Sequence, residues 1–172
     1  MLFTTHAVVG AAIGAASPNI AIGFVGGFLS HHIIDAVPHF DQGSFYTVKA
    51  GPPYLGKARE PYEAHSFRVY RDWVMLFADW GVAAVLFTIF FALLPADLWA
   101  PIVVGAFGGL LPDIIDSSPL WSKKLRSKLR GVFHYHRFHV YFHWTVAGNE
   151  GVLGFGTQTV LVALSLWYLL AQ

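Results

Sequence analysis

The chain has 172 residues, of which 55% are hydrophobic and only 12% are charged. A soluble domain of this length carries about 25% charged residues, so the composition indicates a protein surrounded by lipid. The net charge of +1 is close to zero, and the absence of cysteine excludes disulfides, thiolate metal sites and cysteine nucleophiles. The length fits a single membrane-embedded domain covering residues 1–172.

Apolar runs predict an all-α integral membrane bundle of about five short spans. The runs cover residues 5–16, 19–37, 73–94, 98–115 and 152–171. A span needs about 20 apolar residues, and the first run falls short of this length. Because the turn residues Ser17-Pro18-Asn19 separate the first two runs, we expect these runs to form a helical hairpin packed against the other helices. The amino-terminal run lacks a basic segment and a cleavage signature, so we expect it to be retained.

The basic residues predict the orientation of the bundle. All 11 Lys and Arg lie in two loops, 38–71 and 117–150, and none lies in the two short connections near 18 and 96. Short loops rich in Lys and Arg stay in the cytoplasm. We therefore expect a multi-pass protein of the cytoplasmic (inner) membrane, with two cytoplasmic loops, the amino terminus in the cytoplasm and the carboxyl terminus outside.

The end of the second run carries the clearest candidate metal ligands. His31 and Asp35 are four residues apart, so a helix places both on one face, where they can bind one divalent ion or two neighbouring ions. The alternative is a structural His–Asp hydrogen bond. His32 points about 100° away, and we interpret it as a surface or hydrogen-bonded histidine. Pro38 ends the helix and turns His39 back toward the site.

Other ionisable residues in the apolar runs are expected at a similar depth. They are His6 in the first run, Asp79 in the third, and Asp113 and Asp116 at the end of the fourth. An aspartate inside a span costs about 2.5–3.5 kcal/mol, so it usually faces the protein interior and has a partner. We expect Asp79 to face His31 and Asp35. For Asp116, an ordinary helix-end aspartate is an equal alternative.

The segment 133–144 is rich in histidine and aromatic residues. If it is helical, His136, His139 and His143 form one stripe, whereas His134 lies off it. We expect the segment to lie at the membrane interface with this stripe facing the bundle. The alternative is an aromatic interfacial belt that contains histidines without binding metal.

Three stretches resemble a known group of proteins. Thr5-His6-Ala7, the segment 27–39 and Leu111-Pro112-Asp113 are similar to the bacterial inner-membrane family of membrane-bound metal-dependent hydrolases. They resemble, more distantly, the zinc-dependent phospholipase C and S1/P1 nuclease superfamily. Those helical enzymes hold zinc with an early His, a Pro-Asp segment, and a His-x-x-x-Asp helix followed by Pro-x-His. The positions that match this pattern are His6, His31, Asp35, His39 and Asp113.

The resemblance extends to one more pair and also has a departure. His139 and His143 are similar to a further His-x-x-x-acid pair, with His in place of the acid. In the membrane family, the Pro-Asp segment normally precedes the Ser-His-x-x-x-Asp helix, whereas here Ser30-His31 comes before Pro112-Asp113. The resemblance therefore supports the general chemistry of the group more than the substrate of any one member.

Together, these features predict a metal-dependent hydrolase of phosphoesters with its site at the cytoplasmic face. The expected cofactor is one or more divalent ions, with Zn²⁺ favoured. The expected metal ligands are His6, His31, Asp35, His39, Asp79, Asp113, His136, His139 and His143. Asp79 and Asp116 are the candidate catalytic carboxylates that orient the attacking water. The basic loops would attract an anionic substrate such as a lipid phosphate or phospholipid.

Two other functions are compatible with the same residues. A divalent-metal transporter would need polar residues across the whole membrane, but the segments 11–22, 86–102 and 162–171 contain almost none. In a non-catalytic membrane protein, metal would only brace the bundle, and its coordination would be closed to water. The expected partners are membrane lipids and an anionic or phosphate-bearing substrate. No nucleic-acid motif is present, and the oligomeric state is left open.

Overall fold

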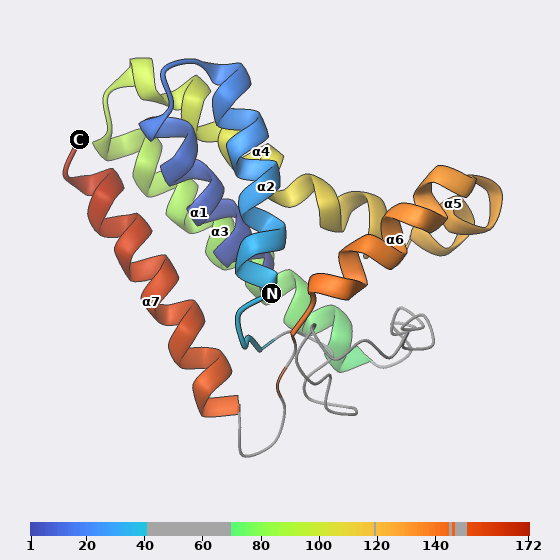
Figure 1. The fold of residues 1–172 in the computed structure, drawn as a ribbon. Helices are drawn as coiled ribbons and strands as arrows, with labels where there is room; N and C mark the ends of the chain where they lie inside the picture. Colours follow the sequence, from blue (N-terminus) through green and yellow to red (C-terminus); the bar gives the residue numbers. More distant parts are fainter. Residues whose placement is uncertain (41–69, 119, 145, 147–150) are drawn as a thin grey trace.

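The computed structural model describes residues 1–40, 70–118, 120–144, 146 and 151–172. These residues form a helical bundle with a projecting arm (Figure 1). The elements are α1 (Phe3–Ala16), α2 (Ile20–Asp35), α3 (Tyr70–Leu93), the 3₁₀ helix η2 (Ala96–Leu98), α4 (Trp99–Asp116), α5 (Ser122–Lys128), α6 (Arg130–Phe142) and α7 (Gly151–Leu170). The predicted all-α fold is confirmed for the described part of the chain. Most of the loop 38–71 lies outside it.

Three helical segments are long and apolar enough to cross a membrane, which corrects the expected number of about five. They are Trp73–Leu93, Ala96–Asp116 and Gly151–Leu170. Helices α1 and α2 are apolar but have 14 and 16 residues. At about 1.5 Å per residue they measure roughly 21 and 24 Å, less than a hydrocarbon core of about 30 Å. The turn between them ends α1 and precedes the start of α2, and the two helices form the expected hairpin.

Glycines bring α1 and α2 into close contact with α4. A methyl group at Gly105 of α4 would collide with the carbonyl oxygen of Gly10, and one at Gly27 of α2 would collide with that of Gly105. One turn further along α4, a methyl group at Gly109 would collide with the carbonyl oxygen of His6. Small residues allow helices in lipid to approach in this way. The close packing sets the polar ends of the three helices at one level.

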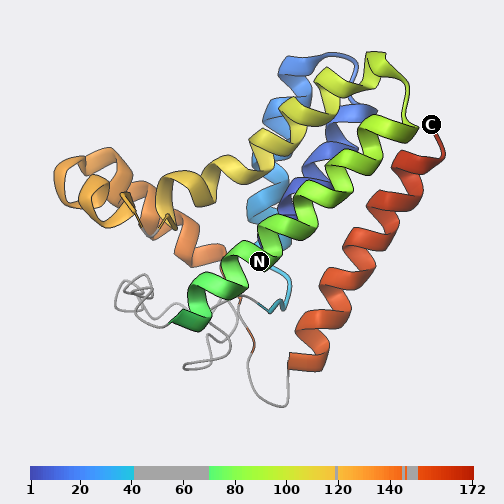
Figure 2. The ribbon, with the colours of Figure 1, turned by 180° about the vertical axis from the view of Figure 1, so that it is seen from behind.

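The short connections lie together at one end of the bundle. Both views show the α1–α2 and α3–α4 connections at the same end as the carboxyl terminus, with the amino terminus toward the other end (Figures 1 and 2). Helices α5 and α6 form the projecting arm, which carries Lys123, Lys124, Arg126, Lys128, Arg130 and Arg137. The described basic residues of the second loop are therefore gathered on one arm.

A buried apolar cluster fills the bundle beyond His6. It contains Val8, Ala11, Phe90, Leu94, Ile102, Ala106 and Leu169. Its members come from α1, α4 and α7, together with α3 and the residue that follows it. Phe90, Ile102 and Leu169 are fully buried. This core separates the polar end of the bundle from the end with the short connections.

Candidate metal centre

Asp35, the last residue of α2, has a fully buried carboxylate surrounded by histidine nitrogens. Its Oδ1 atom lies 3.3 Å from Nε2 of His6 and 3.8 Å from Nε2 of His39. Its Oδ2 atom lies 3.2, 3.4 and 3.5 Å from the Nε2 atoms of His31, His139 and His143. Five imidazoles from separate parts of the chain thus point the same ring atom at one carboxylate.

Asp113 adds a second carboxylate from α4. Its Oδ1 atom lies 3.8 Å from Nε2 of both His31 and His139, and its Oδ2 atom lies 3.9 Å from Nε2 of His6. Its side chain is 21% exposed, whereas that of Asp35 is fully buried. We call these seven residues the His–Asp cluster: His6, His31, Asp35, His39, Asp113, His139 and His143.

Short-range structure explains much of this convergence. His31 and Asp35 are one helical turn apart on α2, as their spacing predicts. After Pro38 the chain turns, and the segment beyond α6 pairs with it. The amide of His39 donates to the carbonyl of Trp144 (3.1 Å), and the amide of Trp144 donates to the carbonyl of Asp35 (2.8 Å). This pairing brings the rings of His39 and His143 to a centroid separation of 4.6 Å.

Backbone carbonyl oxygens accept hydrogen bonds from the outer ring nitrogens, Nδ1, of two cluster histidines. Nδ1 of His31 lies 2.7 Å from the carbonyl oxygen of Gly109, and Nδ1 of His39 lies 2.9 Å from that of Val37. An oxygen acceptor at Nδ1 holds the proton there and leaves Nε2 as a lone pair. Histidines that bind metal are oriented in the same way.

The inner ring nitrogens, the Nε2 atoms that face Asp35, carry more lone pairs than there are hydrogen-bond donors to satisfy them. Nε2 of His31 lies 3.0 Å from Nε2 of His139. Nε2 of His6 lies 3.3 Å from Oδ1 of Asp35 but makes no well-aligned hydrogen bond, and Nε2 of His39 has no hydrogen-bond partner among the described residues. Buried polar atoms without partners are costly, and a divalent cation would satisfy several of them at once. Imidazole nitrogen and carboxylate oxygen are the donors that Zn²⁺ accepts, so the residues fit this ion.

The carboxylates also favour positive charge at His139. Burial lowers the pKa of His139, but hydrogen bonds with Asp116 and Asp35, together with the charge of Asp113, raise it to about 10. In the absence of a metal, His139 is therefore protonated at neutral pH. A cation bound at its Nε2 atom would replace that proton.

Two groups in the cluster have the geometry of ion sites. One consists of His6, His31 and Asp113, and the other of Asp35, His139 and His143. Within each group, the ligand atoms lie within 4.8 Å of one another. Since Asp35 also approaches His6 and His31, its carboxylate lies between the two groups.

Asp116 lies behind the cluster, although the sequence made it a candidate for orienting water. Its oxygens lie 2.8 Å from Nδ1 of His136 and 3.0 Å from Nδ1 of His139, and it forms an ion pair with Arg126 (3.2 Å). Asp116 is thus placed to orient His139. His136 contacts Asp116 and not Asp35. It lies on α6 three residues before His139, and this position brings its ring to Asp116.

Asp79 has other partners than the expected His31 and Asp35. Its two carboxylate oxygens accept hydrogen bonds from the amides of Phe3 (2.7 Å) and Thr4 (3.1 Å), and the Thr4 hydroxyl donates to its carbonyl oxygen. The first amides of a helix lack partners within the helix, and a carboxylate there also interacts favourably with the helix dipole. Asp79 therefore caps α1.

Two further groups at the site were not identified from the sequence. The Met1 amino group donates to Oδ1 of Asp35 (2.9 Å). Gln158 of α7 accepts from the amide of Leu2 (2.9 Å) and donates to the carbonyl of Phe40 (2.8 Å), so it links the start of α1 to the chain after α2. Gln158 is a polar residue inside an apolar run, and this pattern could have indicated that it forms buried hydrogen bonds.

Of the two interpretations of His32, a surface or a hydrogen-bonded histidine, the structure supports the second, because the residue is buried and has a polar contact. Its Nε2 atom lies 3.3 Å from the Tyr135 hydroxyl, and its ring packs edge-on against Phe28 and Phe138. It also lies close enough to His31 and His139 to form a third group with metal-ligand geometry.

Comparison of the chain with protein-family models, with curated proteins and with solved structures gives no match.

Proposed function

We propose that the protein is an integral membrane hydrolase that uses divalent metal, preferably Zn²⁺, to cleave phosphoesters. The observation that carries this proposal is the convergence of five Nε2 atoms on the buried carboxylate of Asp35. Such a concentration of ligands at the end of apolar helices is costly unless it serves a function. Two adjacent ligand groups with a carboxylate between them are typical of enzymes that hydrolyse phosphoesters with two metal ions.

Six of the cluster residues would bind the ions, and Asp116 would orient one of these residues. His6, His31 and Asp113 would hold one ion, and Asp35, His139 and His143 would hold a second, with His39 beside it. When bound, a divalent ion supplies a water of lowered pKa, about 7 for Zn²⁺, and polarises a phosphoryl oxygen. Asp116 keeps Nδ1 of His139 engaged, so that its Nε2 atom faces the cluster.

Exposure and charge indicate where a substrate would approach. Asp113 and His143 are the more open members of the cluster, with side chains 21% and 24% exposed. The basic arm of α5 and α6 leads to this side, since His139 lies on α6 and His143 follows it directly. Positive charge near a membrane surface attracts anionic headgroups. We therefore propose a lipid phosphate or phospholipid as substrate and place the site at the cytoplasmic face of the inner membrane.

The apolar core argues against a metal transporter. Beyond the His–Asp cluster, the bundle is filled by the buried side chains of Phe90, Ile102 and Leu169. A transport path needs polar groups or water at that depth. Ions held in the cluster would therefore face one side of the membrane.

Hydrolysis by the metal-loaded protein tests the proposal. The purified full chain would be assayed in detergent micelles for phosphate or headgroup release from phospholipids, lipid phosphates and soluble phosphate monoesters. Wild type should cleave at least one class, and Asp35→Asn should cleave none. Asp97→Asn, which changes an exposed carboxylate in η2, is the matched control and should behave as wild type. Activity that persists in Asp35→Asn, or a metal-loaded protein that cleaves no member of the panel, would overturn the proposal.

A further inference from the structure

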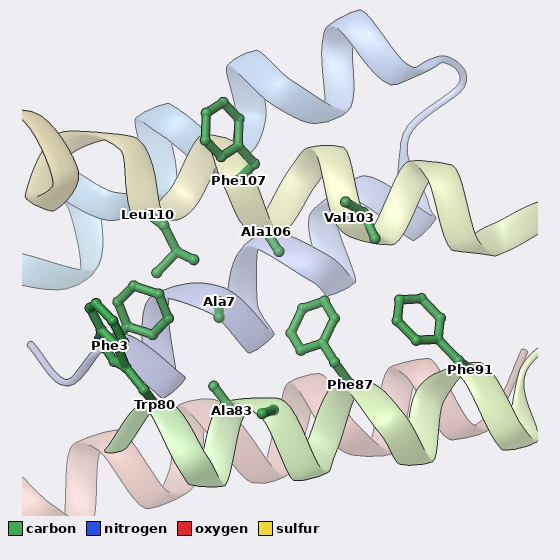
Figure 3. A pocket seen from close by; sticks show the side chains of 11 residues that line it. Phe3, Ala7, Trp80, Ala83, Phe87, Phe91, Val103, Ala106, Phe107 and Leu110 are labelled. Atoms are coloured by element: carbon green, nitrogen blue, oxygen red, sulfur yellow. The ribbon is translucent and has the colours of Figure 1, made fainter. Parts of the chain in front are cut away.

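An apolar groove runs along the bundle between α3 and α4, with α1 as its floor (Figure 3). Trp80, Phe87 and Phe91 line it from α3, and Val103 and Leu110 line it from α4. Its volume is about 470 Å³. Both walls belong to helices that are long and apolar enough to cross a membrane, so the groove faces the acyl chains of the bilayer.

The groove is continuous with the His–Asp cluster. Asp113 follows Leu110 by three residues on α4, which places it on the same side of the helix, one turn beyond the end of the groove. On α1, Ala7 lines the groove and is adjacent to His6. The end of the groove near Leu110 thus lies beside Asp113, the more exposed carboxylate of the cluster.

The dimensions fit a single hydrocarbon chain. The 11 steps along α3 from Trp80 to Phe91 rise about 16 Å, roughly half of a 30 Å hydrocarbon core and therefore the depth of one leaflet. Over that length, 470 Å³ corresponds to a mean cross-section of about 30 Å², and the groove is open along one side.

We infer that the α3–α4 groove holds one acyl chain of the substrate, whose phosphate then lies at the His–Asp cluster. This inference rests on the proposed function and narrows its substrate to a phosphate-bearing lipid that enters sideways from the bilayer. Lipid tails are as apolar as the groove, so selectivity comes from close packing and not from removal of water.

Photo-crosslinking tests the groove independently of hydrolysis. The full chain would be reconstituted into phosphatidylcholine nanodiscs containing a trace of phosphatidic acid with a diazirine in its acyl chain, and the labelled peptides would be mapped by mass spectrometry. Label should concentrate on α3 and α4 around Phe87, Phe91 and Val103.

Two matched substitutions locate the binding. Ala84 is exposed and lines the groove, so Ala84→Phe fills the groove without crowding the core, and Ala84→Leu is a milder alternative. Ala21→Phe is the control: Ala21 is also exposed and lines a separate depression on α2 of about 400 Å³. Ala84→Phe should reduce labelling of the groove about tenfold, the effect of losing roughly ten atomic contacts. Ala21→Phe should leave the labelling unchanged.

The same variants separate the groove from the proposed hydrolysis. Ala84→Phe should lower kcat/KM for long-chain phosphatidic acid and leave that for glycerol 3-phosphate unchanged. Labelling as strong on α2 as in the groove, or unaffected by both Ala84 variants, would overturn the inference even if hydrolysis is found. Labelling confined to the groove without hydrolysis of any substrate would support the groove and remove the proposed function.

Discussion

Substitution of Asp79 distinguishes a helix cap from a catalytic carboxylate. Asp79→Ala removes the acceptor for the amides of Phe3 and Thr4, which lie 2.7 and 3.1 Å from its oxygens. Loss of a capping residue costs about 0.5–2 kcal/mol, and hydrogen bonds to a charged group contribute about 1.5–3 kcal/mol each. Because both oxygens are used, we expect a loss of about 2–4 kcal/mol, or roughly 5–10 °C in Tm. Asp79→Asn keeps one amide oxygen as acceptor and should lose about half as much.

Thermal unfolding in detergent, followed by tryptophan fluorescence, measures these losses, and the metal content of each variant is determined in parallel. Asp79→Asn should retain its metal and most of its activity, since Asp79 contacts α1 and not the ring nitrogens. Asp97→Ala, at an exposed position in η2, is the control and should unfold like wild type. If Asp79→Asn unfolds like wild type but is inactive, Asp79 acts in the chemistry and the capping argument is wrong.

His31→Ala should lose bound metal and activity, whereas His32→Ala should keep most of both. If metal analysis shows equal loss of metal in the two variants, the different directions of the two side chains on α2 do not decide which one binds metal. Asp116→Asn should weaken metal binding about 10–100-fold, because it orients His139; unchanged affinity in a competition titration would refute this role. Since the pKa of His139 is raised to about 10, metal must displace a proton below that pH, so affinity should rise with pH, by about tenfold per unit between pH 6 and 8. Calorimetry in buffers of different ionisation enthalpy should detect the released proton, and binding without proton release would argue against His139 as a ligand. As the chain has no cysteine, single cysteines at 18 or 96 should react with an impermeant reagent from outside and one at 128 should not; the reverse pattern would invert the orientation.

The sequence was sufficient for the features that depend on local spacing. The turn at Ser17–Asn19, the shared face of His31 and Asp35 and the reversal at Pro38 each follow from helix geometry or proline chemistry. The structure also brings His6, Asp113, His139 and His143 to Asp35. Their common depth in the apolar runs was the available signal, because an ionisable group in a span needs a partner.

The partner of each residue could not be predicted in this way. Asp79 lies at the expected depth, but its carboxylate accepts hydrogen bonds from the amides at the start of α1 and not from a histidine ring. Because almost every residue has a backbone amide, side-chain types along the sequence do not indicate such a partner. Asp116 and His136 pair with each other because α5 and α6 fold back against the end of α4, a tertiary arrangement that spacing does not contain. The number of spans was overestimated because two runs form helices that are too short: the run 5–16 is itself short, and the run 19–37 includes the residues of its own polar end.

Metal analysis of the purified protein tests the central claim most directly. The full chain would be purified without a histidine tag, equilibrated with Zn²⁺ and desalted, and its metal would be counted by plasma mass spectrometry beside Asp35→Asn and Asp97→Asn. Wild type and Asp97→Asn should retain about one or two divalent ions per chain, in accordance with the two ligand groups, and Asp35→Asn should retain almost none. Equal metal in all three proteins, or no metal in wild type after equilibration, would show that the His–Asp cluster is not a metal centre.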